Sequence, residues 1–124
     1  MKIILASKSE VRKKILYKNN FTCTVVPSNV DEDQVKNSLL AVGADPMLIS
    51  KNLAELKSTK ISNRYPDEMV LGADSVISLN NKLINKPKTR EEALKTLKEL
   101  NGSLHHLITS VCISKNGAMI WNFT

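Results

Sequence analysis

A chain of 124 residues with 42% hydrophobic content is long enough for one domain with a core and too short for several. It has no apolar run of the roughly 20 residues that span a membrane and no signal-peptide pattern, so the expected location is the cytoplasm. A formal net charge of +6 suits a phosphate-rich partner, but scattered lysines and 4% aromatic content argue against a nucleic-acid binder.

The N-terminus predicts a strand, a turn and a helix. An apolar run predicts a buried strand over residues 2–6, and a helix over 10–19 follows with Ser9 as its N-cap. Ser7 lies in the turn, and Arg12 lies in the first turn of the helix. A helix N-terminus with hydroxyl groups and a guanidinium favours phosphate binding. The alternative is that the serine simply caps the helix.

Two shorter elements come next. Residues 21–26 alternate weakly and predict a second strand, which ends at Pro27. Asp31 and Glu32 open a short helix that runs to about residue 40. Acidic residues in a first turn match the helix dipole, so Glu32 is either a dipole partner or part of a site.

A longer helix is predicted from Pro46 to about residue 62, with Asp45 as its N-cap. Its helical spacing predicts a buried stripe of Ile49, Leu53 and Leu56. Lys57 falls beside this stripe. It is therefore either an exposed lysine or a cation directed at a site.

Asp74 is the residue that the sequence most strongly indicates for chemistry. It lies in an apolar strand predicted over residues 69–79, directly after Leu71, Gly72 and Ala73. Open α/β sheets bind ligands at the carboxyl ends of their strands. A carboxylate there can hold a divalent cation or accept a proton from water. An ordinary turn aspartate is the alternative.

Asn80 and Asn81 predict a tight turn into a short strand over residues 82–84. Lys86 follows in a loop stiffened by Pro87. Such a loop can direct an ammonium group at a ligand, although an exposed lysine is the common outcome.

The last third of the chain predicts one helix and two strands. Thr89 and Glu92 form a capping box, and the helix ends near Asn101. Its apolar stripe is predicted to be buried and comprises Ala93, Leu94, Leu97 and Leu100. Strands over about 104–114 and 118–123 follow. Because strands and helices alternate, the predicted fold class is α/β, with a mixed twisted sheet flanked by helices in one domain over residues 1–124.

The cysteines and histidines show no metal-binding spacing. Cys23 and Cys112 are far apart in apolar or β-branched stretches, which predicts two buried thiols rather than a disulfide. His105 and His106 lack a partner at zinc spacing, so His105 is interpreted as structural.

Six segments occur in order along the chain: LASKSEVRKKIL at 5–16, VDE at 30–32, LAELKS at 53–58, LGADSVI at 71–77, NKP at 85–87 and NGSLHHLIT at 101–109. Together they resemble the Maf family of nucleotide pyrophosphatases, and an ordered set is more specific than any one segment. The resemblance implies a Maf/ITPase-like fold. It also implies hydrolysis of a nucleoside triphosphate, either non-standard or pyrimidine, to the monophosphate and pyrophosphate, with a divalent cation such as Mg or Mn.

The resemblance further implies roles for individual residues. Asp74 matches the catalytic aspartate that accepts a proton, and Asp74 and Glu32 match the residues that organise the metal. The phosphate- and substrate-binding positions match Ser7, Arg12, Lys57 and Lys86. The chemistry agrees, because attack of water on an α-phosphorus needs an activated nucleophile and cations that offset the triphosphate charge.

Two positions bear on specificity in this family. Val11 matches neither of the family's usual residues before the matched arginine. Ser75 resembles the threonine of members that act on pyrimidine nucleotides, which favours a dTTP- or UTP-like substrate over 7-methyl-GTP. Asn85 stands where the family usually has glycine.

Family members carry a further C-terminal portion, so the chain is expected to be C-terminally truncated, the N-terminal two-thirds of the family fold. This length favours a second hypothesis, a non-catalytic nucleotide-binding or regulatory module. Trp121 and Phe123 should alternate onto one side of the last strand and Ile120 onto the other. An exposed apolar edge of this kind, in a family that tends to dimerise, predicts self-association, for example as a homodimer.

Overall fold

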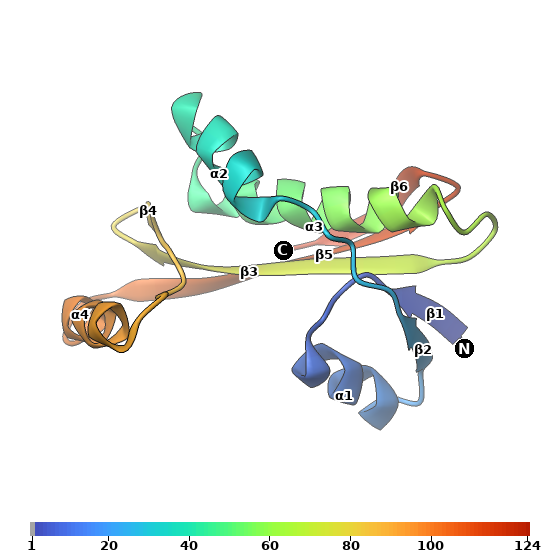
Figure 1. Ribbon diagram of the computed structural model, residues 1–124, viewed down its shortest axis with the longest axis horizontal. Helices are drawn as coiled ribbons and strands as arrows, with labels where there is room; N and C mark the ends of the chain where they lie inside the picture. The colour runs from blue at the N-terminus through green and yellow to red at the C-terminus, as the bar shows by residue number, and fades with distance from the viewer. Residues whose placement is uncertain (1) are drawn as a thin grey trace.

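A computed structural model of the chain, which describes residues 2–124, has a six-stranded sheet with helices on both faces (Figure 1). The elements in chain order are β1 (Lys2–Leu5), α1 (Glu10–Lys18), β2 (Thr22–Val25), α2 (Glu32–Ala41), α3 (Pro46–Ser62), β3 (Val70–Leu79), β4 (Lys82–Ile84), α4 (Arg90–Leu100), β5 (His105–Lys115) and β6 (Ala118–Phe123). The predicted α/β class with a mixed sheet is confirmed.

The strands leave an opening along one edge of β3. The sheet order is β2-β1-β3-β5-β6, and β4 also pairs with β3. β5 covers one whole edge of β3. On the other edge, the parallel strand β1 pairs only as far as Leu71, and the antiparallel strand β4 begins pairing at Ile77. Residues 72–76 therefore have no strand partner on that edge within the part of the chain that the structure describes.

Each of the helices α1, α2, α3 and α4 begins with a side-chain cap. The side chains of Ser9, Asp31, Asp45 and Thr89 each accept a hydrogen bond from the backbone N–H three residues on. These caps satisfy donors that a helix N-terminus otherwise leaves unpaired. The bounds of the helices therefore lie close to those predicted.

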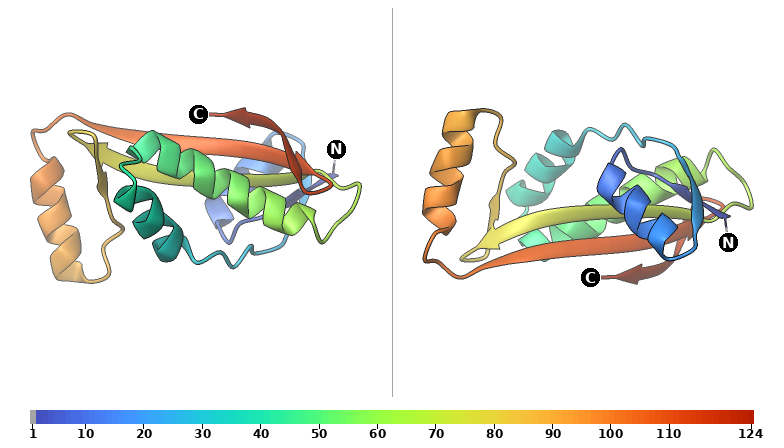
Figure 2. Two further views of the ribbon diagram at one scale, coloured as in Figure 1. Left: turned by 90° about the horizontal axis from the view of Figure 1, so that it is seen from above. Right: turned by 90° about the horizontal axis from the view of Figure 1, so that it is seen from below.

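A glycine lets α3 approach β3 closely (Figure 2). A Cβ added at Gly72 would lie 2.4 Å from the carbonyl oxygen of Ala54 and 2.8 Å from the backbone nitrogen of Ser58. The hydroxyl of the same Ser58 lies 2.7 Å from the hydroxyl of Ser114 on the neighbouring strand β5. Small residues thus face one another where the helix crosses the sheet.

The buried stripe of α3 differs in part from the prediction. Ile49 and Leu53 are fully buried as predicted, but Leu56 is 38% exposed, so that part of the prediction is wrong. Because Ala54 and Ser58 face Gly72, Leu56 turns outward. Lys57 takes an inward position instead.

The predicted burial of the α4 stripe is also wrong. Leu94 and Leu97 are 54% and 65% exposed, and Ala93 and Leu100 are only half-buried. The capping and periodicity predict the helix correctly, but α4 lies beyond the end of the sheet, beside the β3–β4 turn (Figure 1). The exposure of Leu94 and Leu97 shows that the sheet does not cover them.

The cysteine and edge-strand predictions are mostly confirmed. Both cysteines are free, and Cys112 is buried, but Cys23 is only half-buried because β2 is an outer strand.

Trp121 and Phe123 share one side of β6, with ring centroids 6.4 Å apart. Both rings and Ile120 are exposed on this outer strand, and self-association stays a prediction. In residues 2–124 no helix has the length and hydropathy needed to cross a bilayer.

Candidate active site

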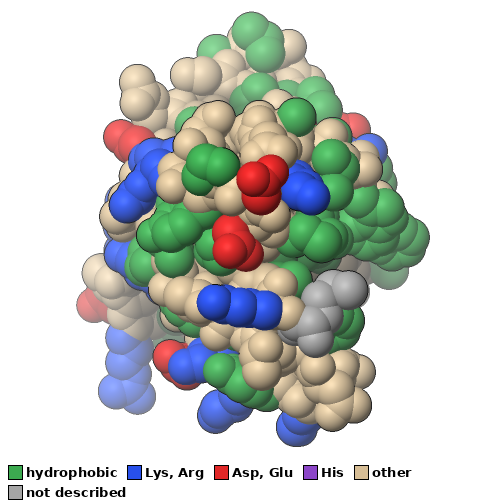
Figure 3. Space-filling model, turned by 90° about the vertical axis from the view of Figure 1, so that its right-hand side faces the viewer, with side chains coloured by type: hydrophobic (Ala, Val, Ile, Leu, Met, Phe, Trp, Pro, Cys, Tyr) green, Lys and Arg blue, Asp and Glu red, His purple; other side chains and the backbone are tan. Residues whose placement is uncertain are grey.

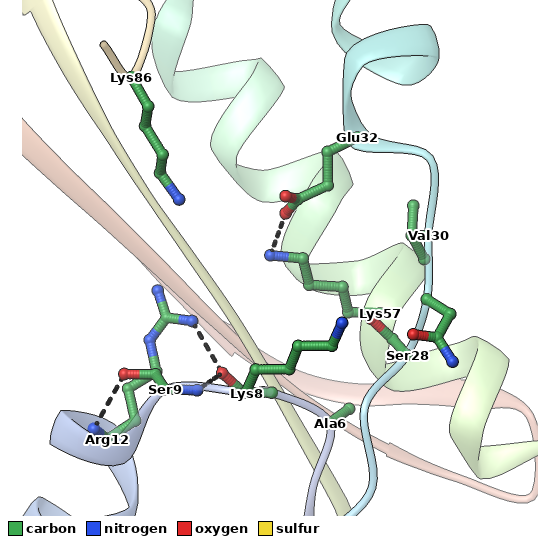
Figure 4. A pocket seen from close by; sticks show the side chains of 11 residues that line it. Ala6, Lys8, Ser9, Arg12, Ser28, Val30, Glu32, Lys57 and Lys86 are labelled. Carbon is green, nitrogen blue, oxygen red and sulfur yellow. Dashed lines mark hydrogen bonds and ion pairs between the residues drawn. The ribbon is translucent and has the colours of Figure 1, made fainter. Parts of the chain in front are cut away.

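A cavity of about 400 Å³ is lined by Arg12 and Lys57, whose side chains donate to the Ala73 carbonyl on the open edge of β3. The segments that line it come from the turn after β1, the start of α1, the segment before α2, α3 and the loop after β4 (Figure 4). Its polar lining consists of Ser7, Lys8, Ser9, Arg12, Ser28, Asn29, Glu32, Lys57 and Lys86. Four of these side chains carry positive charge and one carries negative charge, so the cavity suits an anion.

Arg12 is held at one wall of the cavity by the unpaired edge of β3. Its Nη1 donates to the Ser7 hydroxyl and to the carbonyl oxygen of Ala73, both at 3.2 Å, and its Nη2 lies 3.5 Å from Ser75 Oγ. The Ala73 carbonyl belongs to the stretch 72–76, which within residues 2–124 has no strand partner on this edge of β3. The guanidinium thus donates a hydrogen bond to a backbone carbonyl oxygen that the strands on this edge do not reach, and this bond fixes the orientation of the guanidinium.

Lys57 joins two carboxylates on the other wall. Its Nζ lies 2.5 Å from Glu32 Oε1 and 3.2 Å from Asp74 Oδ1. It also donates to the carbonyl oxygen of Ala73 at 3.3 Å. Lys57 and Asp74 are 9% and 3% exposed. The shared ammonium lets two acids lie close together in a poorly solvated place, where their charges would otherwise repel.

The two carboxyl groups are perturbed in opposite directions. Burial raises the pKa of Asp74 above 3.8 by more than the charge and hydrogen bond of Lys57 lower it, and the charge of Glu32 adds to the rise. Burial also acts to raise the pKa of Glu32, but the hydrogen bond and charge of Lys57, together with the charges of Lys86 and Lys36, bring that pKa below 4.5. A carboxylate with a raised pKa is a stronger proton acceptor than an ordinary aspartate.

Substituting Lys57 by methionine should raise the pKa of Asp74 further. The change removes the positive charge and the hydrogen bond that favour the ionised carboxyl group, while burial and Glu32 remain. Carboxyl ¹³C chemical shifts followed against pH measure this directly. The exposed Lys60, one turn on in α3, provides the control variant Lys60→Met, which should leave the titration unchanged. An unaltered or lowered pKa in Lys57→Met would show that the ammonium does not govern this carboxyl group.

The carboxylates present an incomplete oxygen-donor set that suits a hard divalent cation. Asp74 Oδ2 is buried without a hydrogen-bond partner in residues 2–124. Mg²⁺ prefers oxygen ligands and is commonly held by one or two carboxylates together with substrate phosphates. In the same residues, no cluster of three or more His, Cys, Asp or Glu side chains could hold a metal unaided. Glu32 and Asp74 therefore fit a cation shared with a phosphate ligand.

The structure brings most of the sequence-predicted residues together. Ser7, Arg12, Glu32, Lys57 and Lys86 line one cavity, and Asp74 contacts Lys57. Figure 4 shows Arg12 and Lys86 pointing toward each other across it.

The two predicted specificity residues lie elsewhere. Val11 is 67% exposed on α1 and does not line the cavity. Ser75 bonds to Arg12 and to the hydroxyl of Thr109, 2.9 Å away, and lines a neighbouring hollow.

Sequence reasoning missed several polar residues of the site. Lys8 lies in the same turn as Ser7, so its position was a usable signal. Ser28 and Asn29 lie in the segment between β2 and α2, where Asn29 adopts a φ of 52°. Lys36, one turn beyond Glu32 on α2, lies near both carboxylates and lowers the pKa of each. No motif singles it out.

Comparisons with known proteins identify the relatives of this chain. The family described as Maf-like protein matches residues 2–124. A nucleoside triphosphate pyrophosphatase of Pelagibacter ubique (strain HTCC1062) is 64% identical over 98% of this chain and 63% of its own length. A dTTP/UTP pyrophosphatase of Pyrococcus furiosus is 38% identical over 96% of this chain and 59% of its own length. The chain thus spans about three-fifths of the length of these curated relatives.

A solved structure supports the fold. The Staphylococcus aureus Ham1 protein superimposes with a TM-score of 0.57 at 14% sequence identity, covering 93% of this chain and 64% of that one. At this identity the likeness concerns the fold alone, and it agrees with the predicted ITPase-like architecture.

Proposed function

The chain belongs to the Maf-like protein family, and from this premise we propose that it hydrolyses a nucleoside triphosphate to the monophosphate and pyrophosphate. One observation carries the proposal: Lys57 joins Glu32 and Asp74 beside a cavity that is lined by further cations. A triphosphate needs those cations, and its hydrolysis needs a proton acceptor. The names of the relatives support the same reaction.

The cavity walls would bind the triphosphate. Arg12 presents a planar donor group that grips two phosphate oxygens, and Lys86 approaches from the opposite wall (Figure 4). Lys8 adds a third charge, and the Ser7 hydroxyl can still donate its proton while accepting from Arg12. These contacts offset the charge that the leaving pyrophosphate carries.

Asp74 would accept the proton. The oxygen of a water molecule attacks the α-phosphorus, and the bond from that phosphorus to the α,β-bridging oxygen breaks. Pyrophosphate leaves with the bridging oxygen, the water hydroxyl stays on the monophosphate, and the water proton passes to Asp74. Lys57 holds the acceptor oxygen Oδ1 in place.

Glu32 and Asp74 would hold a divalent cation such as Mg²⁺ or Mn²⁺, in keeping with the Oδ2 atom of Asp74, which is buried without a hydrogen-bond partner among residues 2–124. When bound, the cation supplies Lewis-acid polarisation of phosphate oxygens and lowers the pKa of water. Ser75 and the name of the Pyrococcus relative favour dTTP or UTP as substrates, and the cytoplasm is the proposed location.

Nucleic-acid binding has little support. Figure 3 shows Lys and Arg side chains dispersed around acidic ones on one face of the molecule, without a continuous basic patch there.

The test is pyrophosphate release by the purified chain with Mg²⁺ or Mn²⁺ over a panel of nucleoside triphosphates. We expect release with dTTP and UTP in particular. A triphosphate that raises the melting temperature but is never cleaved would contradict hydrolysis and favour the nucleotide-binding module instead. If the chain neither binds nor cleaves any of the triphosphates, both functions are overturned.

A further inference from the structure

The chain contains two Asn-Gly pairs, Asn101–Gly102 after α4 and Asn116–Gly117 in the turn between β5 and β6. An asparagine that precedes a glycine can lose its side-chain amide spontaneously, because glycine has no Cβ to keep its backbone nitrogen away from the Cγ atom of the asparagine. The reaction requires that the side-chain amide and this backbone nitrogen are both free to move. The surroundings of each pair therefore decide whether it reacts.

The pair Asn116–Gly117 is held in place by neighbouring segments. Asn116 Oδ1 accepts a hydrogen bond from the backbone N–H of Asp67 at 2.8 Å, and Asn116 Nδ2 lies 3.4 Å from Asp67 Oδ1. The backbone N–H of Gly117 donates to the Ser62 hydroxyl at 2.9 Å. The side chain of Asn63 also lies beside Gly117, where an added Cβ would collide with it. Both groups that would have to react are thus occupied.

The pair Asn101–Gly102 lacks these restraints. Both residues are exposed, and nothing lies within 4 Å of a Cβ added at Gly102. Within residues 2–124, neither the side-chain amide of Asn101 nor the backbone N–H of Gly102 makes a hydrogen bond. The backbone N–H of Asn101 still donates to the carbonyl oxygen of Leu97 at 3.0 Å, so the pair is tied to α4 only on its N-terminal side.

We propose that Asn101 is a site of spontaneous deamidation and that the fold protects Asn116 from the same reaction. The Gly102 nitrogen attacks Asn101 Cγ, and the new bond closes a cyclic imide. The bond from Cγ to Nδ2 breaks, and ammonia leaves with the proton of the Gly102 N–H. Water then opens the imide at either carbonyl carbon and returns a proton to the Gly102 nitrogen. The product is aspartate or iso-aspartate at position 101, formed without an oxidant, a metal or another protein.

The modification changes the end of α4 and leaves the core alone. A carboxylate at position 101 lies at the C-terminal end of the helix, where the helix dipole disfavours negative charge. Iso-aspartate also adds a backbone carbon between α4 and β5. Because α4 has no buried residues and β5 begins pairing only at His105, the folded core does not depend on this connection. Modified chains should therefore stay folded and accumulate with age.

The test ages the folded chain in mildly alkaline buffer and follows both pairs by peptide mass spectrometry. Cleavage by trypsin after Lys98 and Lys115 leaves Asn101 as the only asparagine in its peptide and places Asn116 in the next one. Asn116 is the matched control, since it has the same glycine neighbour in the same sample. A fresh sample digested in parallel corrects for deamidation during digestion.

In the folded chain, Asn101 should deamidate about tenfold or more faster than Asn116, because the hydrogen bonds that hold the second pair must first break. In guanidinium the two rates should become comparable, since the denatured chain lacks those bonds. The variant Asn101→Gln, whose longer side chain would have to close a larger ring, should abolish the mass gain of its peptide.

Equal rates at the two asparagines in the folded chain, or faster reaction at Asn116, would overturn the proposal. A difference between the two that persists in guanidinium would also contradict it, because the neighbouring residues in the sequence, rather than the fold, would then set the rates.

Discussion

Replacing Asp74 by asparagine is expected to lower pyrophosphate release by about 10²- to 10⁴-fold, the range typical of a lost general base. The amide keeps the size and one oxygen of the carboxylate but cannot take the proton from water. Its fold should survive, because burial raises the pKa of Asp74, which means that the ionised form is disfavoured in the folded chain. Turnover with saturating substrate and a melting curve measure the two effects separately.

The pH dependence of pyrophosphate release by the parent chain should also reveal the role of Asp74 as the proton acceptor. Because the pKa of Asp74 lies above 3.8, its carboxylate is protonated at a higher pH than an ordinary aspartate. The rate should therefore fall on the acid side as pH drops through this raised pKa, and residual activity of Asp74→Asn should lack that limb. Asp67→Asn, in the exposed turn before β3, is the matched control and should retain full turnover. Undiminished turnover in a folded Asp74→Asn variant would remove Asp74 from the mechanism.

Replacing Gly72 by alanine is expected to lower the free energy of unfolding by about 3 kcal/mol, the upper part of the range for overpacked interiors. The added methyl group would lie 2.4 Å from a backbone oxygen of α3, and backbone cannot rotate away as a side chain can. The helix must then move off the sheet. Urea denaturation measures the loss.

Gly43→Ala is the control variant, because it makes the same glycine-to-alanine change at a position where the added methyl group meets no neighbouring atom. Gly43 has a φ of 81° and nothing within 4 Å of an added Cβ, so its variant meets only the backbone strain of about 1–2 kcal/mol. A Gly72→Ala variant no less stable than Gly43→Ala would show that α3 and β3 do not need their close approach. Because α3 carries Lys57 and β3 carries Asp74, the displaced helix should also weaken catalysis in Gly72→Ala.

The sequence predicts correctly those features of the structure that depend on residues close together in the chain, such as helix N-caps and tight turns. The side chains of Ser9 and Thr89 bond to backbone groups three residues away, so the sequence predicts these helix starts. Asn80 and Asn81 both adopt positive φ, 52° and 62°, which is what a two-residue hairpin turn requires and asparagine tolerates. The ordered motifs likewise predict the family and five of the residues that line the cavity: Ser7, Arg12, Glu32, Lys57 and Lys86.

Burial depends on which surfaces the fold brings opposite one another. The periodicity of α4 predicts an apolar stripe correctly, yet Leu94 and Leu97 remain exposed because α4 lies beyond the end of the sheet. Leu56 is displaced from the buried side of α3 because the helix turns its small residues toward Gly72. No pattern within either helix contains this information.

The amino-acid sequence by itself determined the α/β class, the ends of the helices and the residue types of the site, because capping, turns and periodicity act between residues close in the chain. Only the tertiary structure decided that, among residues 2–124, no strand pairs with one edge of β3 over residues 72–76. That opening orphans the Ala73 carbonyl, which then accepts hydrogen bonds from both Arg12 and Lys57. Arg12 and Lys57, which are 61 and 16 residues from Ala73 in the sequence, therefore meet at this carbonyl oxygen. A buried acceptor needs a hydrogen-bond donor, and here the tertiary fold brings the donors to it.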